Sequence, residues 1–149
     1  MPRSSSKKAQ AQPVAEEQNS PRYHINLESS PDSQSMSLFI ADRRCYACQQ
    51  GDTPLDVLAK DPEDVMQQIV EHCAATPDYL LLDTPLKEAA FRLLLAGGNE
   101  PMNAVELGRA LSERWAMSAY PREVSAAVVQ RLLDHSPYYG IAKAEEAKA

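Results

Sequence analysis

Two cysteines separated by two residues place the strongest constraint on what this 149-residue chain can fold into. Cys45 and Cys48 stand in the stretch RRCYACQQG, and His72 and Cys73 follow next to each other further along the chain. In zinc knuckles, the tight turn between two such cysteines lets both thiolates bind one ion at about 2.3 Å. Together the four side chains form a Cys3His set, and we predict that they hold a structural Zn²⁺ ion.

Helix geometry opposes the simultaneous use of His72 and Cys73. Neighbouring residues on a regular helix point about 100° apart, so both side chains reach one ion only where the helix is ending. If the helix stays regular, the fourth ligand is expected to be one of three other side chains, namely His24, Asp42 or Asp52.

Two other interpretations of Cys45 and Cys48 remain open at this point. In the first, the pair is reduced and free of metal, and Cys73 is an unrelated buried residue, since free cysteine packs as a small hydrophobe. In the second, CYAC is a thiol redox motif. Thioredoxin-like motifs lie at the start of a helix that follows a strand, and no strand–helix–strand pattern surrounds CYAC. Arg43 and Arg44 would lower a thiol pKa, and they would equally offset the charge of a thiolate-rich zinc site.

A shortage of large apolar side chains in the first part of the chain favours the metal. Residues 23–83 carry eleven acidic and three basic side chains, and a segment of this size seldom folds by apolar burial alone. A metal cross-link is a common remedy in small folds. We therefore expect the ion to join the RRCYACQQG loop to a helix at about 61–75.

Charge and composition disfavour several classes of protein. The net charge is -6, and no region has the strong basic excess that tight binding of duplex nucleic acid usually needs. No apolar stretch reaches the ~18–20 residues of a membrane span, and the N-terminus has no hydrophobic block of the secretory kind. Three cysteines without such a signal favour a reducing cytoplasm.

Shifts in composition divide the chain into four parts. Residues 1–22 are rich in Ser, Gln, Pro and Lys and are expected to form a disordered arm, with residues 144–149 as a disordered tail. Residues 23–83 form the acidic zinc-knuckle segment, and residues 84–143 hold three helical patterns and a short strand. The predicted fold class is mostly α, with the zinc-knuckle segment followed by a truncated winged helix.

Capping signals place the helices. Helices are predicted at about 61–75, 84–98, 103–117 and 121–135. Asp61 precedes the first of them, and Asn103 with Glu106 forms a capping box at the start of the third. The stretch PYYGIAK follows the last helix, and Tyr139 and Ile141 alternate there as in a strand.

Residues 84–143, here called the C-terminal block, resemble the winged-helix domains of the HARE-HTH type. These domains occur in the delta subunit of bacterial RNA polymerase and in chromatin-linked proteins. The stretches LKEAAFRLLLAGGNEPMNAVELGRAL and SAAVVQRLLDHSPYYGIA carry this resemblance. The region 23–142, with CxxC and YYG, also resembles a set of small bacterial proteins that supply no activity to carry over. What the resemblance implies is a binding module near transcription, with no catalytic residue.

If the block bound DNA as winged helices usually do, the helix at 121–135 would enter the major groove. At 100° per residue, the predicted inward side chains are Val124, Val128, Leu132 and, less centrally, Val129. The predicted outward side chains are Glu123, Gln130, Arg131 and Asp134. Two carboxylates on that face would repel phosphates, so base or phosphate contacts by Arg122, Gln130 and Arg131 belong to an alternative hypothesis only.

The main hypothesis is a non-enzymatic, zinc-binding accessory protein of a bacterium that docks on a larger machine, with RNA polymerase as the expected partner. The acidic segment would face a basic protein surface, which speeds association. The first alternative is a DNA-binding transcription regulator whose basic arm contacts phosphates. The second alternative is a thiol redox protein that uses Cys45 and Cys48. No small-molecule substrate is expected.

Overall fold

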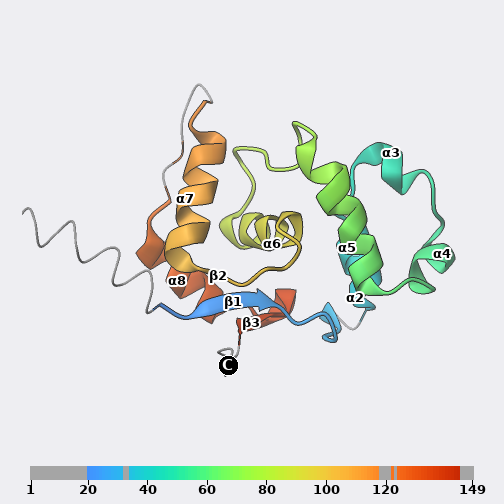
Figure 1. Ribbon diagram of the computed structural model, residues 1–149, viewed down its shortest axis with the longest axis horizontal. Helices are drawn as coiled ribbons and strands as arrows, with labels where there is room; N and C mark the ends of the chain where they lie inside the picture. Colours follow the sequence, from blue (N-terminus) through green and yellow to red (C-terminus); the bar gives the residue numbers. More distant parts are fainter. Residues whose placement is uncertain (1–19, 32–33, 118–121, 123, 145–149) are drawn as a thin grey trace, which may run out of the picture.

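The computed structural model describes residues 20–31, 34–117, 122 and 124–144. Within these ranges the chain forms seven α-helices and one antiparallel sheet of three strands (Figure 1). The helices are α2 Met36–Ala41, α3 Tyr46–Gln49, α4 Pro54–Leu58, α5 Pro62–Glu71, α6 Leu86–Ala96, α7 Ala104–Trp115 and α8 Ala126–Asp134. The strands are β1 Arg22–Ile25, β2 Met102–Asn103 and β3 Ile141–Lys143. The predicted mostly α class is therefore confirmed.

Residues at the helix ends explain most of the boundaries. Asp61 immediately precedes α5, and the predicted capping box of Asn103 and Glu106 begins α7. The helix predicted at 61–75 is shorter, because α5 ends at Glu71 and a 3₁₀ turn, Cys73–Ala75, follows it. This early end decides the geometry of the candidate metal site.

The C-terminal block has the predicted order of helix, short link, helix, helix and strand. The strand starts later than expected, because Pro137–Tyr139 form a 3₁₀ turn and β3 begins at Ile141. Gly140 lies between them with a φ of 75°, a left-handed conformation that glycine adopts without a steric penalty. A Cβ at this position would also collide with the Ser29 hydroxyl, so the turn requires glycine.

β1 lies in the middle of the sheet and pairs with strands from the far end of the chain (Figure 1). Tyr23 stands opposite Met102 of β2, and Ile25 stands opposite Ile141 of β3. Residues 23–25, which the sequence assigns to the acidic segment, therefore complete the sheet of the C-terminal block. The division drawn from composition does not follow the sheet, because composition carries no information about strand pairing.

The ends of the predicted arm and tail also take part in the sheet. Arg22 belongs to β1, and its carbonyl oxygen accepts a hydrogen bond of 2.7 Å from the backbone amide of Ala144. Residues 1–19 and 145–149, which make up most of the predicted arm and tail, lie outside the described residues.

One cluster of buried apolar side chains runs through both parts of the described chain. α6 lies at its centre, between α5 on one side and α7 on the other, and its Phe91 and Leu94 are fully buried (Figure 1). Residues 42–56 are the exception, since Arg44 is the one buried side chain among them. The helices on either side of this stretch contribute more to the core than the acidic composition of 23–83 suggests.

The inward face of α8 differs from the prediction. Val129 and Leu133 are its buried side chains, whereas Val128 is 37% exposed. Leu132 is only half-buried. The observed face is shifted by one residue from the predicted one, which corresponds to a rotation of about 100°.

Close contact between α7 and the residues before α8 accounts for this rotation. A Cβ added to Gly108 of α7 would lie 3.0 Å from the carbonyl oxygen of Val124, so the absence of a side chain lets the two backbones approach closely there. The backbone amide of Val124 also donates a hydrogen bond of 3.1 Å to the hydroxyl of Ser112 in α7. Residue 124 therefore lies outside the helix, and α8 starts at Ala126 with Ser125 as its cap.

Candidate metal centre

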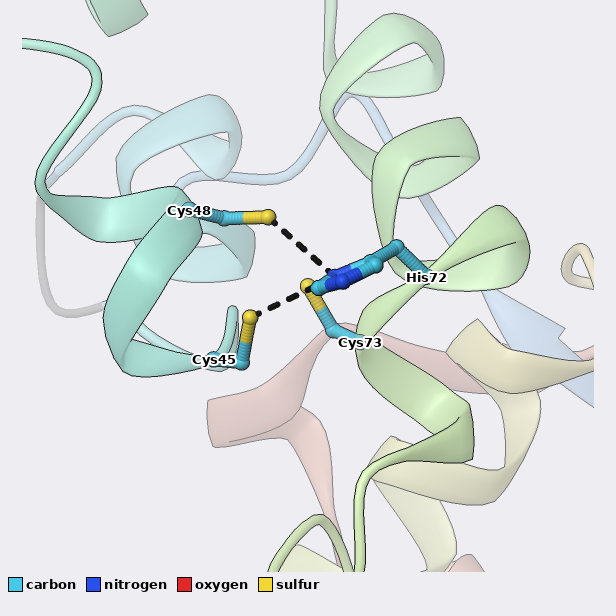
Figure 2. Close-up of side chains that lie close together, drawn as sticks. All are labelled: Cys45, Cys48, His72 and Cys73. Carbon is cyan, nitrogen blue, oxygen red and sulfur yellow. Dashed lines mark hydrogen bonds between the residues drawn. The ribbon is translucent and has the colours of Figure 1, made fainter.

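Cys45 and Cys48 belong to a single helical turn. Cys45 directly precedes α3 and has an extended backbone, with φ of -69° and ψ of 164°. Cys48 lies within α3, three residues further on, which is the spacing that puts two side chains on one side of a helix. Both sulfur atoms point toward the end of α5 (Figure 2).

His72 and Cys73 lie where α5 stops. His72 has a φ of -137° and a ψ of -60°, far from helical values, and Cys73 begins the 3₁₀ turn. This break removes the 100° separation that a regular helix would impose between neighbours. Both side chains therefore face Cys45 and Cys48, as the prediction for an ending helix required (Figure 2).

The distances among the four ligand atoms suit one tetrahedral metal ion. One atom from each of Cys45, Cys48, His72 and Cys73 lies within 4.8 Å of the others. The Nδ1 atom of His72 is 3.4 Å from Sγ of Cys45 and 3.5 Å from Sγ of Cys48. A tetrahedral site with Zn–S of about 2.3 Å and Zn–N of about 2.0–2.1 Å has S···N edges of about 3.6 Å. The cluster could therefore hold a metal ion with His72 binding through Nδ1.

The structure separates the three substitute ligands from this cluster. His24 lies on β1 in the sheet, and Asp42 directly follows α2. Asp52 pairs instead with cations, at 2.8 Å from Arg44 and 3.1 Å from Lys60. None of these three belongs to the ligand cluster found among the described residues.

The three thiols have different acidities. The backbone N–H of Cys48 lowers the pKa of Cys45 to about 7, against the opposing effect of burial. Burial raises the pKa of Cys48, and the neighbouring Cys45 side chain raises it further. Burial raises the pKa of Cys73 to about 12. A bound divalent ion would offset the cost of deprotonating Cys48 and Cys73, because the charge of the metal stabilises a coordinating thiolate.

Arg44 fixes the stretch that carries the two cysteines. It is 7% exposed, and its guanidinium donates to the Ala41 carbonyl, to Asp52 and to Gln68 of α5. The carbonyl of Arg44 accepts a hydrogen bond of 2.7 Å from Gln49. Its positive charge also lowers the pKa of Cys48, against the stronger effect of burial, as expected of a cation beside a thiolate-rich site.

Sequence reasoning did not find this structural role of Arg44. It treated Arg43 and Arg44 alike, but Arg43 pairs with Glu88 of α6 at 2.8 Å. The Arg43 guanidinium also lies 4.0 Å from the centre of the Phe39 ring. Nothing in the stretch RRC distinguishes the two arginines before the fold is known.

Two of the three candidate nucleic-acid contacts are engaged within the fold. Arg122 donates to the carbonyls of Leu82 and Thr84, and its guanidinium is 4.7 Å from the Trp115 ring. Gln130 donates to the Tyr23 hydroxyl. Arg131 is exposed on α8.

Asp134 is exposed on α8, as predicted, but its carboxylate also makes hydrogen bonds within the fold. The Tyr23 hydroxyl of β1 donates to its carboxylate, and Gln130 contacts it from one turn earlier on the same helix. Burial and the Asp134 carboxylate raise the pKa of Tyr23 to about 12. This side of α8 therefore packs against the sheet.

Comparison with known proteins assigns no family. No protein-family model, no curated protein and no solved structure matches the chain. Within the described residues, no helix combines the length and apolar character needed to cross a bilayer. The likeness of the C-terminal block to winged-helix domains therefore rests on its residue pattern, and the cluster of three cysteines and one histidine is the most specific chemical feature of the molecule.

Proposed function

We propose that this protein is a non-enzymatic, zinc-binding accessory protein that docks on a larger assembly through protein contacts. The observation that carries the proposal is the convergence of Cys45, Cys48, His72 and Cys73, whose ligand atoms lie within 4.8 Å of one another. Three thiolates and one imidazole are a common ligand set of structural zinc sites.

Zinc suits this ligand set better than other common divalent ions. Thiolates are soft ligands, and a tetrahedral arrangement of sulfur and nitrogen favours zinc, whereas calcium and magnesium prefer oxygen. Catalytic zinc sites keep three protein ligands and leave one position for water or substrate. Here four protein ligands would fill the tetrahedron, which supports a structural rather than a catalytic role.

The same closed ligand set favours metal binding over the redox alternative. CYAC does lie at the start of a short helix, as redox motifs do, but the preceding element is α2 and not a strand. His72 and Cys73 also lie against the pair. A disulfide exchange site needs no such additional ligands, so the arrangement favours metal binding.

Docking through protein contacts is favoured over DNA reading by the hydrogen bonds of α8 and of Arg122, which precedes it. Arg122, Gln130 and Asp134 make hydrogen bonds within the fold, which leaves Arg131 as the exposed candidate contact. The acidic character of residues 23–83 adds repulsion toward phosphates. RNA polymerase remains the expected partner on the resemblance of residues 84–143 alone.

Metal analysis and affinity purification test the proposal together. The protein purified without added metal should contain about one zinc per chain, measured by mass spectrometry of the elements. The tagged protein at native level should retain a defined multisubunit partner, RNA polymerase in the first instance, that an untagged lysate does not yield. A metal-free protein with a reversible Cys45–Cys48 disulfide would overturn the zinc proposal, and salt-sensitive retention of random duplex DNA without a protein partner would overturn docking.

A further inference from the structure

We propose that the exposed apolar side chains of α3 and α4 dock a basic amphipathic segment of the partner protein, an inference that rests on the proposed docking function. Three large apolar side chains are exposed there: Tyr46 on α3, and Leu55 and Leu58 on α4. We call these three residues the knuckle face. Both helices lie at the end of the molecule opposite α7 (Figure 1).

The exposure of the knuckle face is large. Tyr46 and Leu55 are each 78% exposed, and Leu58 is 50% exposed. Leu55 and Leu58 are three residues apart on α4, so their side chains are neighbours on its surface. α4 itself is attached to the core through Val57, its one buried side chain. Leu55 and Leu58 thus form a small exposed apolar patch, and exposed apolar patches bordered by polar residues mark sites of protein contact.

Charge identifies the kind of partner. Residues 46–64 contain five carboxylates and one lysine, and Asp56, Asp61, Glu63 and Asp64 are all exposed. The single cation, Lys60, lies 3.1 Å from Asp52, which offsets its charge. An apolar surface with an acidic rim complements a helix or strand that carries leucine-like side chains on one side and Lys or Arg beside them.

The metal site would hold the knuckle face in shape. Tyr46 stands between Cys45 and Cys48 in the sequence, so an ion bound by these two ligands would fix the backbone that carries Tyr46. Thr53 and Asp56 form a reciprocal capping box at the start of α4. A surface ordered before association loses less conformational entropy on binding, and rigid aromatic residues often contribute most of the affinity.

Two other occupants are less compatible with this surface. A second copy of the chain would bring the same acidic rim and a net charge of -6, so like charges would meet. The basic residues of the chain's own 1–19 segment would suit the charge, but that segment contains no Leu, Ile, Phe, Trp or Tyr to cover the apolar side chains.

A peptide-binding experiment tests the inference. The probe is a fluorescein-labelled 18-residue helical peptide of Leu and Lys with one apolar side, compared with the same peptide in which every Lys is Glu. The full, zinc-loaded chain should bind the Lys peptide, measured by fluorescence anisotropy, with an affinity that falls as salt rises. The Glu peptide should bind at least about 10-fold more weakly, because its charge is repelled.

Surface variants show whether binding uses the knuckle face. The double variant Leu55→Ser with Leu58→Ser should lose at least about 10-fold in affinity for the Lys peptide, consistent with removal of apolar contacts. Leu81→Ser is the matched control, because Leu81 is 52% exposed and lines a cavity with Asp78 and Asp83. This control should bind like the unchanged protein. Zinc content and circular dichroism should be the same in all three proteins.

The opposite results are also informative. Equal affinity of the double variant and the unchanged protein, or self-association that the double variant abolishes, would overturn the inference. If the double variant still retained the partner in affinity purification, docking would take place elsewhere, and the proposed function would survive without the knuckle face. A protein that bound no zinc would instead overturn the proposed function, whatever the peptide result.

Discussion

Residues 42–56 and helix α7 are held in place by different forces. Among residues 42–56, Arg44 is the one buried side chain, and the stretch depends on hydrogen bonds, ion pairs and its two candidate metal ligands. In α7, by contrast, every turn contributes to the core, with Leu107, Leu111 and Trp115 buried. Each buried leucine of this kind stabilises the fold by roughly 1.5–3 kcal/mol.

The difference shows where a metal ion would matter most. The composition of residues 23–83 suggests that a metal holds the whole segment, but α2 and α5 bury Phe39, Ile40 and Ile69 without one. The stretch between these helices lacks that support. We therefore expect the ion to order residues 42–56 and the end of α5, while apolar burial stabilises the rest.

The largest expected effect follows from loss of a ligand. Cys73→Ser should lower zinc affinity by more than about 100-fold, since even the outer-shell partners of metal ligands account for roughly 10–100-fold. Competition with a chromophoric chelator measures this change. Amide exchange in residues 42–56 should become much faster, whereas exchange in α7 should change little.

Readdition of zinc to the unchanged protein after chelation is the control for this experiment, and it should restore slow exchange in residues 42–56. Equal loss of protection in α7 and in residues 42–56 would show that the ion supports the whole fold, which would contradict the comparison.

A core substitution should give the reverse pattern. Leu107→Ala removes a fully buried side chain of α7 and should lower the free energy of unfolding by about 2–5 kcal/mol. Urea denaturation measures this loss. Zinc affinity at low urea should be unchanged, because α7 does not contribute a ligand. A large loss of zinc affinity in this variant would mean that the two regions are tightly coupled.

Glu88 of α6 connects residues 42–56 with the central helix of the core, so its titration tests how strongly that stretch is coupled to the core. Its carboxylate lies 2.8 Å from Arg43 and 2.7 Å from Arg92. Burial acts to raise the pKa of Glu88, but the hydrogen bonds and charges of the two arginines hold it below the usual value. Glu88→Gln should lower the free energy of unfolding by about 1.5–3 kcal/mol at pH 7, as for a hydrogen-bonded charged group.

The sign of the pH dependence follows from the lowered pKa of Glu88. Its contribution to stability is complete above the unfolded value of about 4.3 and is lost as the pH falls through the lower folded value. The unfolding free energy of the unchanged protein should therefore drop more steeply below pH ~4.3 than that of Glu88→Gln. Parallel curves for the two proteins in urea denaturation at several pH values would contradict this assignment.

The smallest effects should come from two matched capping residues. Asn103 begins α7 and Thr53 begins α4, each within a capping box. Asn103→Ala should lower global stability by about 1 kcal/mol, since α7 unfolds with the core. Thr53→Ala should leave the urea midpoint nearly unchanged and speed amide exchange in α4 alone. Equal shifts of the urea midpoint would show that α4 unfolds together with the core.

The candidate site was more predictable from the sequence than the sheet was. Cysteine spacing and the adjacent His72 and Cys73 identified the cluster, because few arrangements bring such residues together by chance. We predicted that His72 and Cys73 would reach one ion only if the helix ended there. The sequence alone does not say where a helix ends, so the break after Glu71 was not itself predicted. Strand β1 was missed as part of the C-terminal block, because pairing across more than a hundred residues leaves no local pattern.

The face of α8 was also mispredicted, for a related reason. Periodicity gave the spacing of its apolar residues, but Val128 and Val129 fit the pattern equally well. Contact between Gly108 and the backbone of Val124 decides between them, and that contact is visible only in three dimensions.

The central place of β1 has a consequence for how the protein is made. A ribosome releases residues 22–25 early, yet their neighbour at 141–143 emerges last among the paired strands. One edge of β1 therefore stays unpaired until residues 141–143 have been synthesised. Helices such as α5 and α6, whose contacts are closer in the chain, can dock during that interval, so closure of the sheet follows the packing of these helices.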